Sequence, residues 1–202
     1  MVGDVGPRIG PVPPEAWDDQ VRQALERAGM AHVPPESLPN AVTTLLRHPR
    51  LAGGFLRYNM GLLVRPALLP RWRELMILRV AWRAGGTYEW LQHAVAAGLN
   101  DVSPEEVAAV ADGGLDHQWG PVEAALLSAT DQLLDHYLID DDTWSRLAEH
   151  LDPLQLFEVP FVVGTYACLA MVFNSFGIEL DPDLEEAAAS GLPVPEPPRG
   201  DG

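Results

Sequence analysis

The sequence predicts an all-α protein, and three observations support this fold class. Apolar residues recur at spacings of three and four along most of the 202-residue chain. Nowhere do apolar and polar residues alternate over a run rich in β-branched residues, which is the pattern of a half-buried strand. Prolines and glycines stand at the ends of many of the periodic segments, where they begin or end helices.

The first helix is predicted over 13–30. Pro14 suits its first turn, acidic residues follow at the positive end of the helix, and Gly29 can end it. A loop over 32–39 leads to two further helices, which are predicted over 40–48 and 50–64 and are separated by Pro49.

The central helix is predicted over 70–84 and ends at a pair of glycines. Thr87 can cap the next helix, which runs to Gly98. Ser103, followed by proline and two glutamates, predicts a helix over 104–112, and a loop is expected over 113–120.

The last predicted helices span 121–139, 143–150 and 153–176, and Pro160 is expected to kink the third. Residues 1–14 are rich in Gly and Pro and are expected to form an extended arm. Residues 181–202 are first acidic and then rich in proline, which predicts a short segment and then a disordered or polyproline tail. We therefore expect a single all-α domain over 15–180.

The charge balance excludes several classes of function. The formal net charge is −16, so an anionic partner such as nucleic acid or an acidic membrane surface is disfavoured. All 13 basic residues are arginine, which rules out a Schiff base on a lysine side chain.

Cys168 is the single cysteine, so no disulfide can form within the chain, and no signal peptide is recognisable. A cytoplasmic protein is expected. The apolar run 159–173 is shorter than the roughly 20 residues of a membrane span and predicts a buried helix.

One carboxylate lies on the apolar face of the central helix. On a helical wheel, Glu74 falls between Ile77, Leu78 and Ala81, all within 60° of it. Loss of water around a core-facing carboxylate raises its pKa and suits it to proton transfer. A buried ion pair with an arginine, or hydrogen bonds from a helix N-terminus, would explain the position equally well.

The segment GGTYEWLQH (85–93) gathers further polar residues. Glu89 and His93 are four residues apart and share a helix face, which is opposite the apolar residues of the same helix. By itself this pattern is typical of a solvated pair. The helix dipole favours the charged form of a first-turn glutamate, which could then polarise the histidine. Because only a Gly-Gly turn joins the two helices, we expect Glu74, Tyr88, Glu89 and His93 to line one pocket.

The stretch RELMILRVAWRAGGTYEWLQHAVAAGL (73–99) resembles the carboxymuconolactone decarboxylase family, which includes the alkylhydroperoxidase D-like proteins. The segments 46–58 and 165–180 fit loosely, so the resemblance covers about 40–180. In the thiol peroxidase branch the matching motif is Cys-x-x-Cys-x-x-x-His, with a glutamate twelve residues before the first cysteine. This sequence keeps Glu74 and His93 but has Gly86 and Glu89 at the cysteine positions. Dithiol peroxidase chemistry is therefore not expected.

The resemblance implies a cofactor-free lyase, decarboxylase or isomerase acting on a small molecule. In this reading His93 is the general acid/base, Glu74 and Glu89 tune and relay its proton, and Tyr88 contributes to the catalytic set. Substrate-binding residues would be Arg71, Trp90 and Tyr166. A carboxylated lactone and a neutral molecule remain equally open as substrates.

Two alternatives remain beside the enzyme. Glu74, Glu89 and His93 could bind a divalent metal, or the protein could be a non-catalytic oligomeric binding protein. Self-assembly is expected in either case, because the resembled family forms symmetric rings and because the helix over 153–176 is very apolar.

Overall fold

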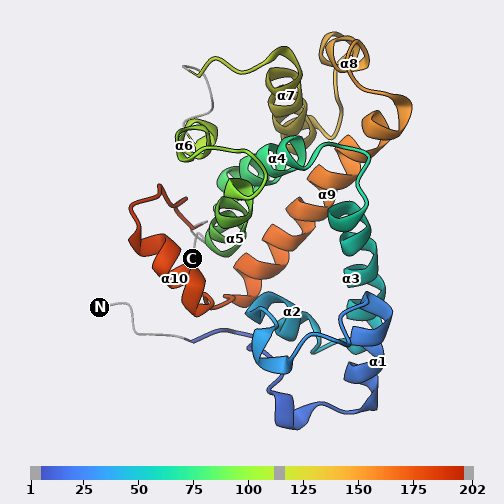
Figure 1. Cartoon of the computed structure of the whole chain (residues 1–202), viewed down its shortest axis with the longest axis vertical. Helices are drawn as coiled ribbons and strands as arrows, with labels where there is room; N and C mark the ends of the chain where they lie inside the picture. Colours follow the sequence, from blue (N-terminus) through green and yellow to red (C-terminus); the bar gives the residue numbers. More distant parts are fainter. Residues whose placement is uncertain (1–5, 112–116, 198–202) are drawn as a thin grey trace. The chain divides into compact units, whose positions relative to one another are not determined.

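The computed structural model describes residues 6–111 and 117–197, and it is all-α, as predicted. The described residues contain no strand (Figure 1). The helices are η1 (Pro14–Ala16), α1 (Asp19–Ala28), η2 (Pro35–Ser37), α2 (Asn40–Leu45), α3 (Pro49–Val64), α4 (Pro70–Arg83), α5 (Thr87–Gly98), α6 (Pro104–Ala111), α7 (Pro121–His136), α8 (Asp141–Ala148), α9 (Pro153–Phe176) and α10 (Pro182–Ala189), where η marks a 3₁₀ turn.

The start of the first helix differs from the prediction. Asp18 is the N-cap of α1, and its side chain accepts a hydrogen bond from the Val21 backbone N–H at 2.9 Å. Pro14–Ala16 forms a separate 3₁₀ turn. An aspartate at the N-cap satisfies an otherwise unpaired helical N–H, so the helix begins at Asp19 and not at Pro14. Gly29, in the left-handed region at φ 75°, ends α1 as expected.

The turn between α4 and α5 is made by the two predicted glycines. Gly85 adopts a left-handed conformation with φ 63°. The next amide, of Gly86, donates to the Ala81 carbonyl at 2.8 Å and closes the end of α4. Gly86 is the N-cap of α5 and Thr87 its first residue, with no side-chain capping bond, so the predicted cap at Thr87 is wrong.

The other boundaries lie close to the predictions. α7 ends at His136 because Tyr137 turns left-handed at φ 59°. α9 continues through Pro160, and the short segment after Asp181 is the helix α10. The predicted C-terminal residue of α6, Asp112, and the first half of the loop 113–120, residues 113–116, lie outside the described residues.

The chain divides into two compact units. The first comprises 1–65 and 175–183, and the second comprises 66–174 and 184–202. The predicted single domain over 15–180 and its two flanking arms stay a prediction.

In the first unit, α1 packs against α3 over an apolar core of side chains from both helices and from the segments before and after them. The two helices approach very closely at Gly53. A Cβ atom at this position would lie 3.1 Å from the Ala24 Cα, so only glycine fits without a shift of backbone.

In the second unit, α4 is the central helix and packs against α5, α6 and α7. Eight of its fourteen residues are buried, which explains why its sequence is apolar almost all round. Glu158 of α9 accepts hydrogen bonds from the Ala67 and Leu68 backbone at 2.8 to 3.0 Å. At the other end of α9, the Asn174 amide donates to the Ala84 carbonyl at 2.9 Å. These bonds fix α9 across the start and the end of α4.

Among the described residues, α9 alone is long and apolar enough to span a membrane by length and composition, a test that the core helix of a soluble protein also meets. It has 24 residues, so the argument from the short run 159–173 does not hold.

Candidate active site

The two residues at the centre of the predicted site are in direct contact. Glu74 projects from α4 and His93 from α5, and Oε2 of Glu74 lies 2.7 Å from Nδ1 of His93. Both side chains are buried, Glu74 to 1% exposure and His93 to 8%. The short Gly-Gly turn therefore brings the two predicted residues together, as the sequence indicated.

Arg73 completes this cluster and was not identified from the sequence. Its Nη2 donates to Oε1 of Glu74 at 2.8 Å, and the side chain is only 5% exposed. Successive residues on a helix do not face each other, so the wheel gave no reason to pair them. The flexible arginine side chain nevertheless reaches its neighbour, and the signal was its place directly before Glu74, at the start of the apolar run of α4.

The pKa of Glu74 shifts in the direction opposite to the one expected. Burial alone raises it, but hydrogen bonds and charge interactions with His93 and Arg73 outweigh burial and lower the pKa below its usual 4.5. The prediction of a raised pKa is wrong because the buried ion pair considered as its alternative is present. Glu74 is an ionised carboxylate, so Nδ1 of His93 carries the proton of this hydrogen bond.

Glu89 is in a different electrostatic environment. Its side chain is 1% exposed, and neither carboxyl oxygen has a hydrogen-bond partner among the described residues. Burial raises its pKa well above the usual 4.5. The solvated Glu89–His93 pair suggested by α5 alone is wrong, because the Glu89 side chain is buried. Burial favours the neutral carboxylic acid form of Glu89 over its carboxylate.

Aromatic side chains surround these groups. The Tyr166 ring from α9 meets the His93 ring edge to face, with centroids 4.9 Å apart. Tyr88 packs edge to face on Phe173 of the same helix at 5.4 Å, and both tyrosines are buried. Trp90 is fully buried against Trp82 with centroids 5.0 Å apart. The predicted site residues Tyr88, Trp90 and Tyr166 therefore lie around the α4–α5 pair, with α9 as the third side.

Arg71 is engaged elsewhere. Its guanidinium binds Glu106 at 2.5 Å and Glu123 at 2.6 Å, and it also donates to the Asp101 carbonyl. None of its contacts in the described part of the chain involves Glu74, Glu89 or His93. Arg79 is bound to Asp131 at 2.8 Å. The structure thus does not bring Arg71 together with the other predicted site residues.

No group of three or more His, Cys, Asp or Glu side chains within the described ranges is arranged to hold a metal ion. Glu74 has both oxygens engaged, one by Arg73 and one by His93. The donor set suggested by the spacing of Glu89 and His93 therefore does not form a metal site with Glu74.

Comparison with known proteins supports one family. A sequence profile described as the carboxymuconolactone decarboxylase family matches residues 49–132. A search of curated proteins finds no significant match.

Solved structures support the same fold. One is an alkylhydroperoxidase AhpD core, an uncharacterised peroxidase-related protein from Ralstonia eutropha JMP134. It is 18% identical and has a TM-score of 0.71, and the match covers 87% of this chain and 94% of that one. A cysteine-to-alanine variant of the debrominase Bmp8 with 2,3,4-tribromopyrrole is 14% identical (TM-score 0.68, 92% and 97% covered). The apo debrominase is 16% identical (TM-score 0.61, 90% and 96% covered).

Proposed function

We propose that this chain, which belongs to the carboxymuconolactone decarboxylase family, is a cofactor-free enzyme that transfers protons to and from a small organic molecule. One observation carries the proposal. On a single helix, one turn apart, stand a histidine oriented by a carboxylate and a buried carboxylic acid that keeps its proton. A histidine held by a carboxylate and a carboxyl group whose burial favours its neutral form are two groups in different environments, the arrangement that acid–base catalysis uses.

His93 is the general base in this mechanism. Glu74 accepts the Nδ1 proton, which fixes the ring and its tautomer and leaves the lone pair of Nε2 directed away from Glu74. The described residues offer no hydrogen-bond partner to Nε2. This nitrogen takes a proton from the substrate carbon, and the electron pair moves into an adjacent carbonyl to form an enolate.

Glu89 is the general acid. As a neutral carboxyl it donates its proton to the enolate or to the carbanion that remains when CO₂ leaves, and it becomes a carboxylate. In an isomerisation Glu89 protonates the enolate at another carbon, and in an elimination it protonates the leaving group that the enolate expels; the proton taken up by His93 then returns to Glu89. In a decarboxylation no proton is taken from carbon, Glu89 protonates the carbanion, and solvent restores its proton. They differ in which bond of the substrate breaks, and the substrate decides between them.

The site carries little net charge, so it favours substrates that are neutral or carry a single charge. Arg73 cancels Glu74, and Glu89 is neutral. A carboxylated lactone is thereby no longer opposed by several buried negative charges, and a neutral molecule remains equally suitable. The related fold of the debrominase holds a small halogenated pyrrole, which supports a small molecule as the substrate class. Dithiol peroxidase chemistry needs two thiols, and the sequence has one cysteine.

The test is proton exchange in D₂O, followed by NMR on a panel of ketones, lactones and carboxylated lactones. For the compounds turned over by the wild type, we expect His93→Gln and Glu89→Gln to lower kcat by about 10²- to 10⁴-fold. Glu149→Gln, which removes an exposed acid after α8, is the control. Full turnover by both site variants would refute the assignment.

An exposed apolar face favours a second property, self-assembly. Leu154, Phe157, Phe161 and Met171 of α9 are 42% to 70% exposed. The first three follow one another at spacings of three and four, and Met171 lies ten residues further on, within about 100° of them on a helical wheel. We propose that a second copy of the chain covers them. Light scattering after gel filtration tests this proposal. Phe157→Asp is expected to lower the mass of the particle, and an unchanged mass would contradict the proposal.

We also propose a cytoplasmic location, which the single free cysteine supports.

A further inference from the structure

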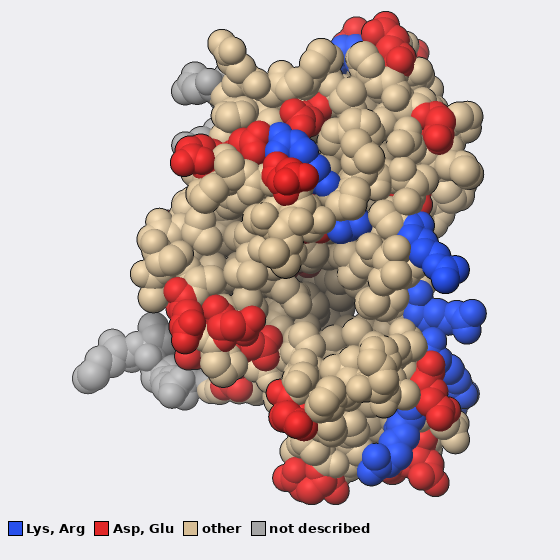
Figure 2. All heavy atoms as spheres, in the orientation of Figure 1, with Lys and Arg blue, Asp and Glu red and all other residues tan. Residues whose placement is uncertain are grey.

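Basic residues are strongly segregated along the chain. Residues 37–73 contain six of the 13 arginines and no acidic residue, although the whole sequence carries 29 acids. Helix α3 lies inside this stretch. Figure 2 shows basic side chains gathered along the edge of the molecule that α3 occupies in Figure 1. Arg71 and Arg73 are paired with glutamates. The other four arginines of the stretch have no carboxylate partner among the described residues, so the surface around α3 is locally positive on an acidic protein.

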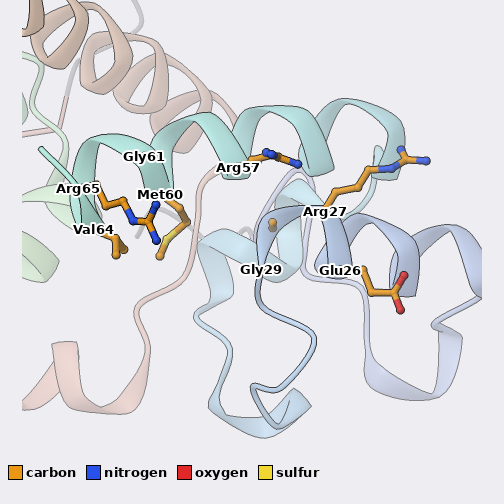
Figure 3. Close-up of a pocket in the computed structure, with 9 residues that line it drawn as sticks. Glu26, Arg27, Gly29, Arg57, Met60, Gly61, Val64 and Arg65 are labelled. Carbon is orange, nitrogen blue, oxygen red and sulfur yellow. The ribbon is translucent and has the colours of Figure 1, made fainter.

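A cavity of about 520 Å³ opens between α1 and α3, within the first unit (Figure 3). This volume lies in the range of small-molecule sites. Its lining residues come from the C-terminal ends of the two helices and are Glu26, Arg27, Ala28, Gly29, Arg57, Met60, Gly61, Val64 and Arg65. Three arginines and one acid make the lining positive overall.

The three arginines of the cavity have no ion-pair partner in the part of the chain that the structure describes. In contrast, Arg71, Arg79 and Arg83 of the second unit are all bound by carboxylates. Figure 3 shows the Glu26 carboxylate extending away from the arginines. The guanidinium groups of the cavity are thus available to a ligand.

The remaining lining is apolar and open. Val64 is 64% exposed and Met60 half-buried, and both lie beside Arg65 in Figure 3. Gly29 and Gly61 have no side chain, and a Cβ atom at either position would meet no atom within 4 Å, so the floor of the cavity is wide. An apolar surface beside free guanidinium groups fits a ligand with a charged head and an apolar body.

We propose that this cavity binds a small organic anion. Arg27, Arg57 and Arg65 supply the positive charge that attracts a carboxylate or phosphate head, and a guanidinium group donates paired N–H bonds to it. The apolar body of the ligand packs on Met60 and Val64. This site shares no residue with Glu74, Glu89 and His93, and it is independent of the function proposed for them.

Isothermal titration of the full chain with octyl phosphate, octanoate, inorganic phosphate and octanol tests the proposal. We expect saturable binding of one octyl phosphate or octanoate, weaker binding of inorganic phosphate and of octanol, and a loss of affinity as salt rises. The two amphiphiles separate a preference for phosphate from one for carboxylate. No saturable binding of either amphiphile would overturn the proposal.

Matched variants locate the binding. Arg57→Gln and Arg65→Gln should each weaken octyl phosphate about 10- to 100-fold, as the loss of a hydrogen bond to a charged group does. The controls are Arg22→Gln on α1 and Arg50→Gln on α3, which remove exposed arginines outside the cavity and should leave the affinity unchanged. Equal weakening by controls and cavity variants would mean a diffuse charge effect and would overturn the site.

An acidic segment of a second copy could occupy the same arginines. In that case gel filtration would show a dimer that dissociates at high salt and that Arg57→Gln also dissociates. That result would replace the small anion by a protein partner and overturn the proposal. We expect the mass of the particle to be the same in wild type and in Arg57→Gln.

Discussion

Two helix pairs of this protein differ in where their charged side chains lie. Between α1 and α3 the interface is apolar and closed at Gly53, and the arginines of both helices lie outside it. Between α4 and α5 the buried set includes Arg73, Glu74, Glu89 and His93. Buried charges cost folding free energy that hydrophobic residues of the same size would not. The first pair is therefore built for stability, and the second keeps groups whose presence a structural role does not require.

The two buried glutamates of the second pair also respond to pH in opposite ways. The pKa of Glu74 is lowered, so its contribution to stability is present above pH 4.5 and is lost as the pH falls below that value. The pKa of Glu89 is raised, so the folded protein holds a proton above pH 4.5 that the unfolded chain releases, and stability falls as the pH rises. The two glutamates of this helix pair thus lower the stability of the fold at acidic pH through Glu74 and at higher pH through Glu89.

The largest effect is expected where a buried charge loses one of its two partners. Arg73→Met leaves Glu74 with His93 alone and should lower the free energy of unfolding by about 1.5–3 kcal/mol, the cost of a lost hydrogen bond to a charged group. Urea denaturation at pH 7 measures it. The double variant Arg73→Met/Glu74→Met should regain most of this loss, because a well-packed apolar pair replaces the ion pair. A single variant as stable as the wild type would show that the ion pair of α4 is not the structural difference between the pairs.

The next effect separates the two glutamates. Glu89→Gln keeps the shape of the neutral acid but cannot ionise. As the pH rises above 4.5 toward the raised pKa of Glu89, the free energy of unfolding of the wild type should fall by about 1–3 kcal/mol relative to that of Glu89→Gln. The reason is that the unfolded chain ionises Glu89 freely, whereas the folded protein holds this group buried and without hydrogen-bond partners among the described residues. Urea denaturation from pH 5 to pH 8 measures the difference. Parallel pH profiles of the two proteins would mean that Glu89 is already ionised in the folded state.

Glycines provide the third contrast. Gly53→Ala places a Cβ 3.1 Å from the Ala24 Cα and should cost about 1–2 kcal/mol, because backbone must move. Gly86→Ala meets no atom closer than 3.5 Å at φ −85° and should be neutral or slightly stabilising. Thermal unfolding of the two variants compares them directly. Equal losses would show that the interface of α4 and α5 is as tightly packed as that of α1 and α3.

The sequence predicted the α4–α5 pair better than the chemistry inside it. Helical spacing and the two glycines placed Glu74 and His93 together, because both features act over a few residues. The protonation states depend on contacts that spacing does not contain. The face of α5 that carries Glu89 and His93 is covered by α9, about 75 residues further along the chain, where Tyr166 meets His93 and Ala170 lies near Gly86. The sequence of α5 taken without α9 therefore predicts that this face is exposed to solvent.

The prediction of where α1 begins was wrong for a different reason. Pro14, Glu15 and Asp18 all favour a helix N-terminus, and the sequence offered no basis for choosing between them. The choice depends on which side chain reaches a free backbone N–H. Asp18 does so, and Pro14 can only begin a turn. Competing local signals of similar strength, and not a missing signal, account for that error.

The smallest effect repeats the first substitution in the other helix pair. Arg57→Met removes an exposed arginine of α3 that has no ion-pair partner among the described residues, so the free energy of unfolding should change by less than about 0.5 kcal/mol. The same change that disrupts α4 is then silent in α3, and only anion binding should report it. A loss comparable to that of Arg73→Met would mean that this arginine supports the fold, and its role as a ligand group would need another explanation.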